Sequence, residues 1–85
     1  MSNIEWFEKP IEKKASEMNA GDIYQCEFGD VGNIVRVVFE SCESGGVRGA
    51  STKINYHCIG RAESRVMYDL DPIDKATFEV VGRVL

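Results

Sequence analysis

The sequence predicts a mainly β (α+β) domain: a small barrel or a curved antiparallel sheet of about five strands, with one short N-terminal helix. Short segments rich in β-branched and aromatic residues alternate apolar with polar positions, as half-buried strands do. Turn-forming residues separate these segments at short intervals. The chain has 85 residues, enough for one hydrophobic core, so residues 1–85 are interpreted as a single domain.

Residues 1–20 allow two interpretations. Apolar residues follow helical spacing at Ile4, Phe7, Ile11, Ala15 and Met18, but Pro10 would break a continuous helix. We predict a short helix over residues 10–18, with Pro10 in its first turn. An edge strand in the same region is the alternative.

The expected strands are residues 23–28, 34–40, 51–58, 65–70 and 78–84. Residues 19–22, 29–33, 41–49 and 60–64 supply the turns and loops between them. Alternation places these residues on the inward side: Tyr24, Cys26, Phe28, Val35, Val37, Phe39, Ile54, Tyr56, Cys58, Val66, Tyr68 and Leu70. Gly82 interrupts the last strand and indicates a bulge or a tight bend.

Two segments carry a family resemblance. The phrase Met18-Asn-Ala-Gly21-Asp22-Ile23 and the closing Phe78-Glu-Val-Val-Gly-Arg83-Val resemble the opening and closing strands of SH3-like small barrels. The overall organisation is also similar to small accessory proteins encoded by phages and prophages. This resemblance implies a protein that binds and modulates a host macromolecule or sequesters a small molecule. The basic segment 48–65 is a departure, because a minimal barrel does not require it.

The basic segment is the candidate ligand site. The formal net charge of the chain is −4, yet residues 48–65 hold a local excess of cations. The candidate ligand-binding residues are Arg48, Ser51, Thr52, Lys53, His57, Arg61 and Arg65. Hydroxyls and cations in one stretch favour a phosphate-bearing small molecule, such as a nucleotide or cyclic oligonucleotide. An ordinary solvated hairpin is the alternative.

Sequence patterns typical of catalysis or metal binding are missing. Cys26, Cys42 and Cys58 do not form the Cys-x-x-Cys pairs of zinc sites. His57 and Cys58 are neighbours on a strand and therefore point to opposite faces. Residues 69–74 are acidic but lack the glycine and the distal glutamate of a calcium loop. We therefore expect no enzymatic activity, no metal and no cofactor.

The leading interpretation is a non-enzymatic binding module, an accessory or inhibitor protein of the phage type that binds a host protein. Trp6 and Phe7 are the candidate partner contacts, because large aromatic side chains dominate protein interfaces. A chain this short has a small core, so a homo-oligomer is expected. A nucleic-acid-binding small barrel is a further alternative, and the acidic net charge disfavours it.

The expected location is the cytoplasm, which is the host cytoplasm if a phage encodes the protein. An odd number of cysteines and the lack of an Asn-x-Ser/Thr site both suit a reducing compartment. The apolar runs are too short to cross a bilayer, so no membrane association is expected.

Overall fold

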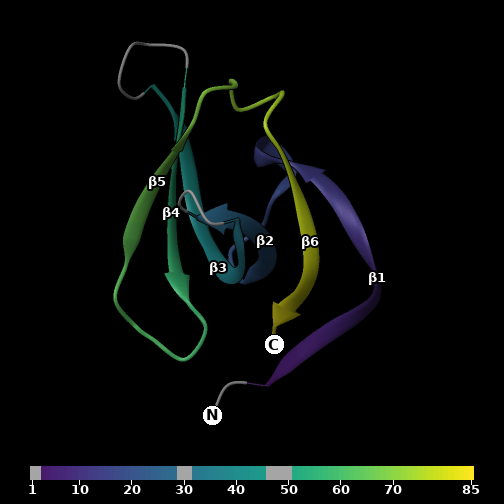
Figure 1. Cartoon of the computed structure of the whole chain (residues 1–85). Helices are drawn as coiled ribbons and strands as arrows, with labels where there is room; N and C mark the ends of the chain where they lie inside the picture. Colours follow the sequence, from purple (N-terminus) through teal and green to yellow (C-terminus); the bar gives the residue numbers. More distant parts are fainter. Residues whose placement is uncertain (1–2, 29–31, 46–50) are drawn as a thin grey trace.

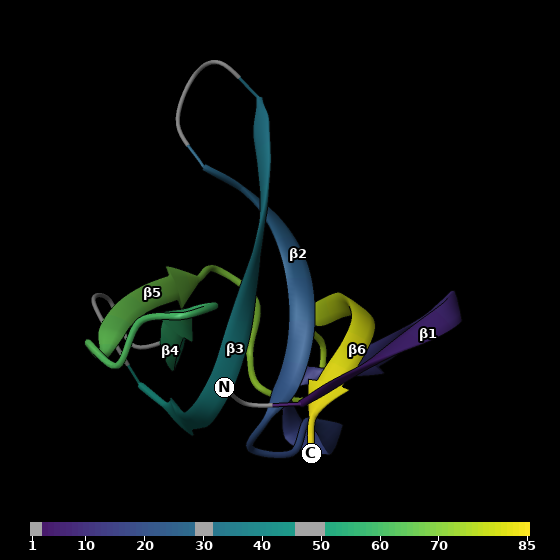
Figure 2. The ribbon, with the colours of Figure 1, turned by 90° about the horizontal axis from the view of Figure 1, so that it is seen from below.

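Six antiparallel strands form one sheet in residues 3–28, 32–45 and 51–85, the part of the chain that the computed structural model describes. The strand order is β1-β6-β2-β3-β4-β5, so β1 and β5 are the two edges (Figure 1). The elements are β1 (Ile4–Lys14), η1 (a 3-10 turn, Ala15–Glu17), β2 (Asp22–Phe28), β3 (Asn33–Ser44), β4 (Thr52–Cys58), β5 (Arg65–Asp69) and β6 (Thr77–Val84). Figure 2 shows β2 and β3 between the β1–β6 pair and the β4–β5 pair.

The prediction of a mainly β domain is confirmed, in the form of one open, curved sheet. No pairing among the described residues joins β1 to β5, so an SH3-like barrel is not confirmed. The described chain also has no helix that is a candidate for crossing a membrane, since η1 comprises only three residues.

The expected helix over residues 10–18 is wrong, and its alternative, an edge strand, is observed. β1 runs along β6 from Ile4 to Lys14, and only Ala15–Glu17 are helical. Pro10 is compatible with this strand because the pairing register with β6 shifts between Trp6 and Ile11. At such an irregularity on an edge strand, the N–H that proline lacks is not needed by a neighbouring strand.

One face of the sheet, called the inner face here, carries the main core. Its buried residues are Ala15, Met18, Tyr24, Val37, Phe39, Ile54, Tyr56, Ala76, Phe78 and Val80. Cys26, Val35 and Cys58 pack against this cluster, so these predicted inward residues of β2, β3 and β4 are confirmed. The side chain of Phe28 lies outside the described part. Tyr24 is fully buried, and its hydroxyl donates to Met67 Sδ at 3.3 Å, which ties the centre of the sheet to β5.

The segment between β5 and β6 covers the inner face. It crosses the open side of the sheet from the end of β5 to the start of β6 (Figure 1). Backbone hydrogen bonds attach it to η1: Ala15 N–H donates to Ala76 O at 2.8 Å, and Ser16 N–H donates to Ile73 O at 3.0 Å. These bonds hold Ala15 and Ala76 together as the lid of the core.

The predicted inward row of β5 is wrong. Val66, Tyr68 and Leu70 are 45%, 54% and 90% exposed, whereas Met67 packs against the inner core. The reason is the register with β4, which pairs Met67 with the buried Ile54 and pairs Val66 with Asn55. Because β5 has apolar residues on both faces, its own alternation could not indicate which face is inward.

The predicted loop over residues 41–49 begins too early. β3 continues to Ser44, and residues 41–44 pair with residues 52–55 of β4. Pairing extends this far because Cys42 lies opposite Ile54 and packs on the inner core. Gly45 N–H then donates to Ser51 O at 3.1 Å, and residues 46–49 of the expected loop lie outside the described part.

Gly82 sits at the predicted irregularity of the last strand. Ile23 pairs with Gly82 and the next residue, Tyr24, pairs with Val80, so Val81 is an extra residue in β6. A Cβ atom on Gly82 would lie 2.6 Å from the backbone oxygen of Glu5 on β1. Only glycine therefore allows β1 to approach β6 this closely.

Replacing Gly82 with alanine should lower the free energy of unfolding by about 1–3 kcal/mol, because the obstructing atom is backbone and cannot rotate away. Urea denaturation followed by circular dichroism measures this. Glu12→Ala, an exposed change on β1, is the control and should stay within about 0.5 kcal/mol of the wild type. A Gly82→Ala protein as stable as the wild type would show that β1 is free to move away.

Candidate functional site

A second apolar cluster lies on the opposite, outer face of the sheet. Ile23, Val38 and Val81 are buried there, and Ile4 and Val84 pack against them. Ile23 and Val38 are paired across β2 and β3, and the bulge in β6 adds Val81 beside them. Both faces of this small sheet therefore carry buried apolar residues.

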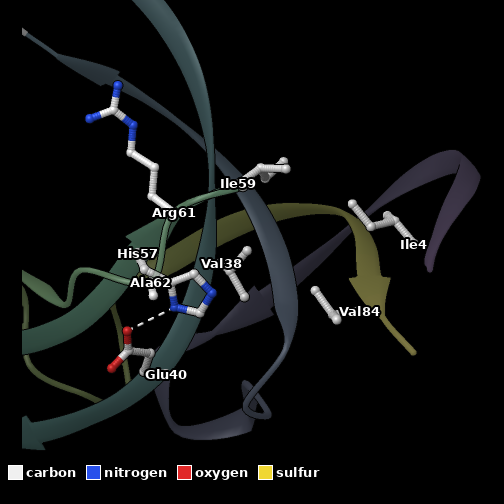
Figure 3. Close-up of a pocket in the computed structure, with 9 residues that line it drawn as sticks. Ile4, Val38, Glu40, His57, Ile59, Arg61, Ala62 and Val84 are labelled. Atoms are coloured by element: carbon white, nitrogen blue, oxygen red, sulfur yellow. Dashed lines mark hydrogen bonds and ion pairs between the residues drawn. The ribbon is translucent and has the colours of Figure 1, made fainter. Parts of the chain in front are cut away.

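A groove of about 830 Å³ lies beside this cluster. The ends of β1 and β6 form one wall with Ile4 and Val84, Val38 lies on the floor, and the connection from β4 to β5 forms the other wall (Figure 3). The residues of that second wall are Ile59, Gly60, Arg61 and Ala62. The volume lies within the range of about 300–1,000 Å³ that is usual for ligand sites.

Glu40 and His57 form the polar end of the groove. The β3–β4 register shifts between Phe39 and Ser41, which leaves Glu40 as an extra residue of β3 next to His57. His57 Nδ1 lies 2.8 Å from Glu40 Oε2, and Ser64 Oγ donates to Glu40 Oε1 at 2.7 Å. A carboxylate oxygen can only accept, so His57 Nδ1 carries a proton and Nε2 of the neutral ring is an acceptor. Figure 3 shows Nε2 on the side of the ring that faces Val84.

The hydrogen bond from Ser64, followed by the one from His57, lowers the pKa of Glu40 below its ordinary value. Glu40 is therefore ionised at neutral pH. Its negative charge orients the imidazole and lies close to any ligand that reaches this end of the groove.

The Ser64, His57 and Glu40 side chains do not have the geometry of a catalytic triad. In a triad the hydroxyl contacts the imidazole, which removes its proton, and the carboxylate orients the imidazole from the other side. Here Ser64 donates to Glu40 instead, so the hydroxyl and the imidazole bind the two oxygens of one carboxylate. The arrangement positions His57 but does not activate Ser64 as a nucleophile.

Arg61 stands on the wall formed by the β4–β5 connection. Gly60 has a φ of 81°, and Arg61 N–H donates to Cys58 O at 3.0 Å, which forms a tight turn. Figure 3 shows the Arg61 side chain extending from this turn on the side away from Val38 and Val84. In the described part of the chain no ion pair involves the Arg61 guanidinium, and the side chain is exposed. It is thus an exposed cation at the rim of the groove, available to an incoming acceptor outside the apolar floor.

The predicted ligand-binding residues are dispersed. His57 and Arg61 both line the groove. Lys53 is on the same face of β4 as His57, but four residues along a strand correspond to about 13 Å, and Lys53 pairs with Glu43 at 3.5 Å. Arg65 is exposed at the sheet edge on β5.

The predicted hydroxyl ligands are not at the groove. Thr52 is fully buried and its Oγ1 donates to Asp71 O at 2.9 Å, so it fastens the segment that follows β5. Ser51 is buried as well. Arg48 lies outside the described residues.

Trp6 and Phe7, the predicted partner contacts, point in opposite directions, as neighbours on a strand do. Phe7 packs against the inner core. Trp6 is on the outer face and half exposed, and the Arg36 guanidinium lies over its ring, 5.2 Å from the centroid. This cation–π contact covers one side of the indole. Of these two residues, Trp6 is therefore the one that is exposed to solvent and could contact a partner.

Several groove residues were not predicted from the sequence. Ile4 and Val84 come from opposite ends of the chain and pair across β1 and β6, which no local pattern indicates. Val38 is the groove residue that the sequence could most readily have indicated, since it is apolar on the face of its strand opposite to Val37. The position of Glu40 beside His57 depends on the bulge in β3, which regular alternation does not predict.

The cysteines face the inner core. Burial, followed by the nearby Cys58, raises the pKa of Cys26 to about 11, so its thiol stays protonated at neutral pH. Cys42 donates to Ala15 O at 3.4 Å. Among residues 3–28, 32–45 and 51–85, no group of three or more histidine, cysteine or acidic side chains is arranged to hold a metal ion.

Comparison of this chain with protein-family models, with curated proteins and with solved structures found no match. The geometry of the groove is therefore the basis for a functional proposal.

Ser64→Ala should raise the pKa of Glu40 toward its ordinary value of 4.5, because it removes the larger of the two causes. The folded-state pKa is lowered, so the stabilisation is present above the unfolded pKa and is lost as pH falls through the folded pKa. In the variant this stabilisation is smaller, and its loss is complete at a higher pH because the folded-state pKa is higher. The pKa of Glu40 is measured by following its carboxyl chemical shift against pH by NMR. Ser44→Ala, four residues further along β3, is the control. Identical titrations of Glu40 in the two variants would contradict the assignment.

Cys26 should react slowly with iodoacetamide in the folded protein. With a pKa of about 11 instead of 9.0, the thiolate fraction at pH 8 is about 100-fold lower, and thiolate is the reactive form. Mass spectrometry of the Cys26 peptide after timed alkylation measures the rate, and the urea-unfolded chain is the control. Equal rates in the folded and unfolded protein would show that Cys26 is not protected.

Proposed function

We propose that this protein is a non-enzymatic binding module that holds a short segment of a partner protein in the outer-face groove. The observation that carries the proposal is the combination of an apolar floor with a polar end in a single groove. Such grooves bind an apolar side chain on their floor, and their few polar groups fix the orientation of the bound segment.

The groove indicates the chemistry of that segment. An aliphatic side chain would rest on Val38 between the wall of Ile4 and Val84 and the wall of Ile59, where it displaces water from an already apolar surface. A carboxylate next to it would pair with Arg61, whose guanidinium can form two parallel hydrogen bonds. A backbone N–H would donate to His57 Nε2. The occupant is thus an extended segment with an aliphatic residue near an acidic one.

A role as an accessory or inhibitory factor of the phage type, acting on a host protein, belongs to the same proposal. It draws support from the resemblance of the opening and closing strands to small SH3-like barrels. It is also supported by a site whose histidine is oriented by a carboxylate and not coupled to a hydroxyl.

A phosphate-bearing small molecule is the second candidate occupant. His57 and Arg61 line the same groove, and the Arg61 guanidinium can donate hydrogen bonds to phosphate oxygens. The ionised Glu40, 2.8 Å from His57, repels a phosphate dianion at this end, and the remaining walls are apolar. These features favour the protein segment over the nucleotide, and the net charge of −4 disfavours nucleic acid.

Ile59→Ser and Arg61→Ala should each weaken binding of the partner by about tenfold or more, since each removes one contact at the centre of a small interface. Ile34→Ser is the matched control, because Ile34 is an exposed isoleucine of β3 that does not line the groove. Immobilised wild type and variants are incubated with cell lysate, and bound proteins are quantified by mass spectrometry.

The expected partner is retained by the wild type and by Ile34→Ser, and is depleted with both groove variants. Proteins retained equally by all four would contradict the proposal. Native mass spectrometry of the purified protein addresses the second candidate. An added mass equal to a nucleotide, lost in Arg61→Ala, would replace the protein segment by a small molecule.

A further inference from the structure

The two edges of the sheet are different in character. β1 carries Lys9, Pro10, Lys13 and Lys14, and its register with β6 is interrupted. Lysine, proline and irregular pairing are the features by which natural sheets prevent another strand from adding to an edge. β1 is therefore a protected edge.

β5, at the other edge, has none of this protection. Its five residues pair with β4 without a shift in register, and they include neither proline nor lysine. In the described part of the chain no strand lies on its outer side, so a row of backbone N–H and C=O groups faces away from the sheet. Val66 and Tyr68 are exposed beside this row.

The sequence of β5 is complementary to itself when reversed. In Arg65-Val-Met-Tyr-Asp69, an antiparallel copy centred on Met67 places Arg65 opposite Asp69 of the second copy. The same register places Val66 opposite Tyr68 and Met67 opposite Met67. Each of these combinations is favourable: an opposite-charge pair, a β-branched residue against an aromatic ring, and two thioethers. All of them occur twice, except the central one, because a two-fold axis relates the strands.

The charges of β5 are available for this pairing. No ion pair involves Arg65 or Asp69 in the described residues, and the contact of Asp69 is the N–H of Asp71, at 2.9 Å from Oδ1. Met67, at the centre, is already held by the core and by the Tyr24 hydroxyl. The side chain at the axis is therefore ordered before the second copy arrives, which reduces the entropy lost on association.

We propose that β5 pairs antiparallel with β5 of a second copy of this chain, in the register that places Met67 on a two-fold axis. One sheet then continues through both copies, and Met67 extends the inner core across the interface. Val66 and Tyr68 become covered on the outer face. Both outer-face grooves lie on the same side of the joined sheet, so a dimer presents two sites to a partner. The pairing is independent of the proposed function of the groove.

Charge reversal at β5 tests this register. Sedimentation equilibrium from micromolar to millimolar concentration should show a wild-type dimer. Arg65→Asp places two acids opposite each other at both ends of the interface, and Asp69→Arg places two bases there. Each should weaken dimerisation by about tenfold or more. The double variant Arg65→Asp/Asp69→Arg restores both attractive pairs and should recover most of the affinity.

Lys9→Glu, a charge reversal on the protected edge, is the control and should leave the dimer unchanged. Circular dichroism shows that each variant is folded, and Arg65→Asp is the cleaner of the single changes because it leaves the Asp69–Asp71 contact in place. A wild type that stays monomeric throughout would overturn the proposal. So would a dimer that the single reversals do not weaken, or one that is weakened and not restored by the double variant.

Discussion

The close approach of β1 to β6 at Gly82 is the constraint on which both faces of the sheet depend. The absence of a side chain lets the backbone of Glu5 lie where a Cβ atom would otherwise be. The bulge at the same place adds Val81 to the outer face while Val80 remains in the inner core. As a result β6 serves two apolar clusters, and the pairing of Ile4 with Val84 builds one wall of the groove.

The two faces of the sheet differ in how far they are covered. On the inner face large side chains are closed over by η1 and by the segment between β5 and β6, which the bonds from Ala15 and Ser16 hold in place. On the outer face the apolar cluster is smaller, and beside it the groove stays open to solvent. The bulge at Glu40 adds a charge there without disturbing the inner pairing of Phe39 with Tyr56. A covered core and an open groove thus coexist in one small sheet.

The strand pattern was predictable because it is local. Alternation and turn residues placed β2, β4, β5 and β6 within a few residues. The described inward residues of β2, β3 and β4 were identified because polar residues alternate with them, most regularly on β4. The prediction for the N-terminal segment was wrong because Ile4, Phe7 and Ile11 follow helical spacing, whereas pairing with β6, with a shift in register between Trp6 and Ile11, makes it a strand. The predicted inward row of β5 was wrong because both of its faces carry apolar residues, and the register with β4 places Met67 on the inner face.

The sequence by itself determined the β class of the domain, the approximate limits of most strands, and the special position of Gly82. It also identified His57 and Arg61 as candidate ligands, although within a set that the fold disperses over buried, paired and edge positions. Only the tertiary structure decided where the groove lies. Its walls combine the first strand, the last strand and the β4–β5 connection, and Glu40 reaches His57 through a bulge. Side-chain periodicity describes one strand at a time, whereas a site of this kind is made by the register between strands.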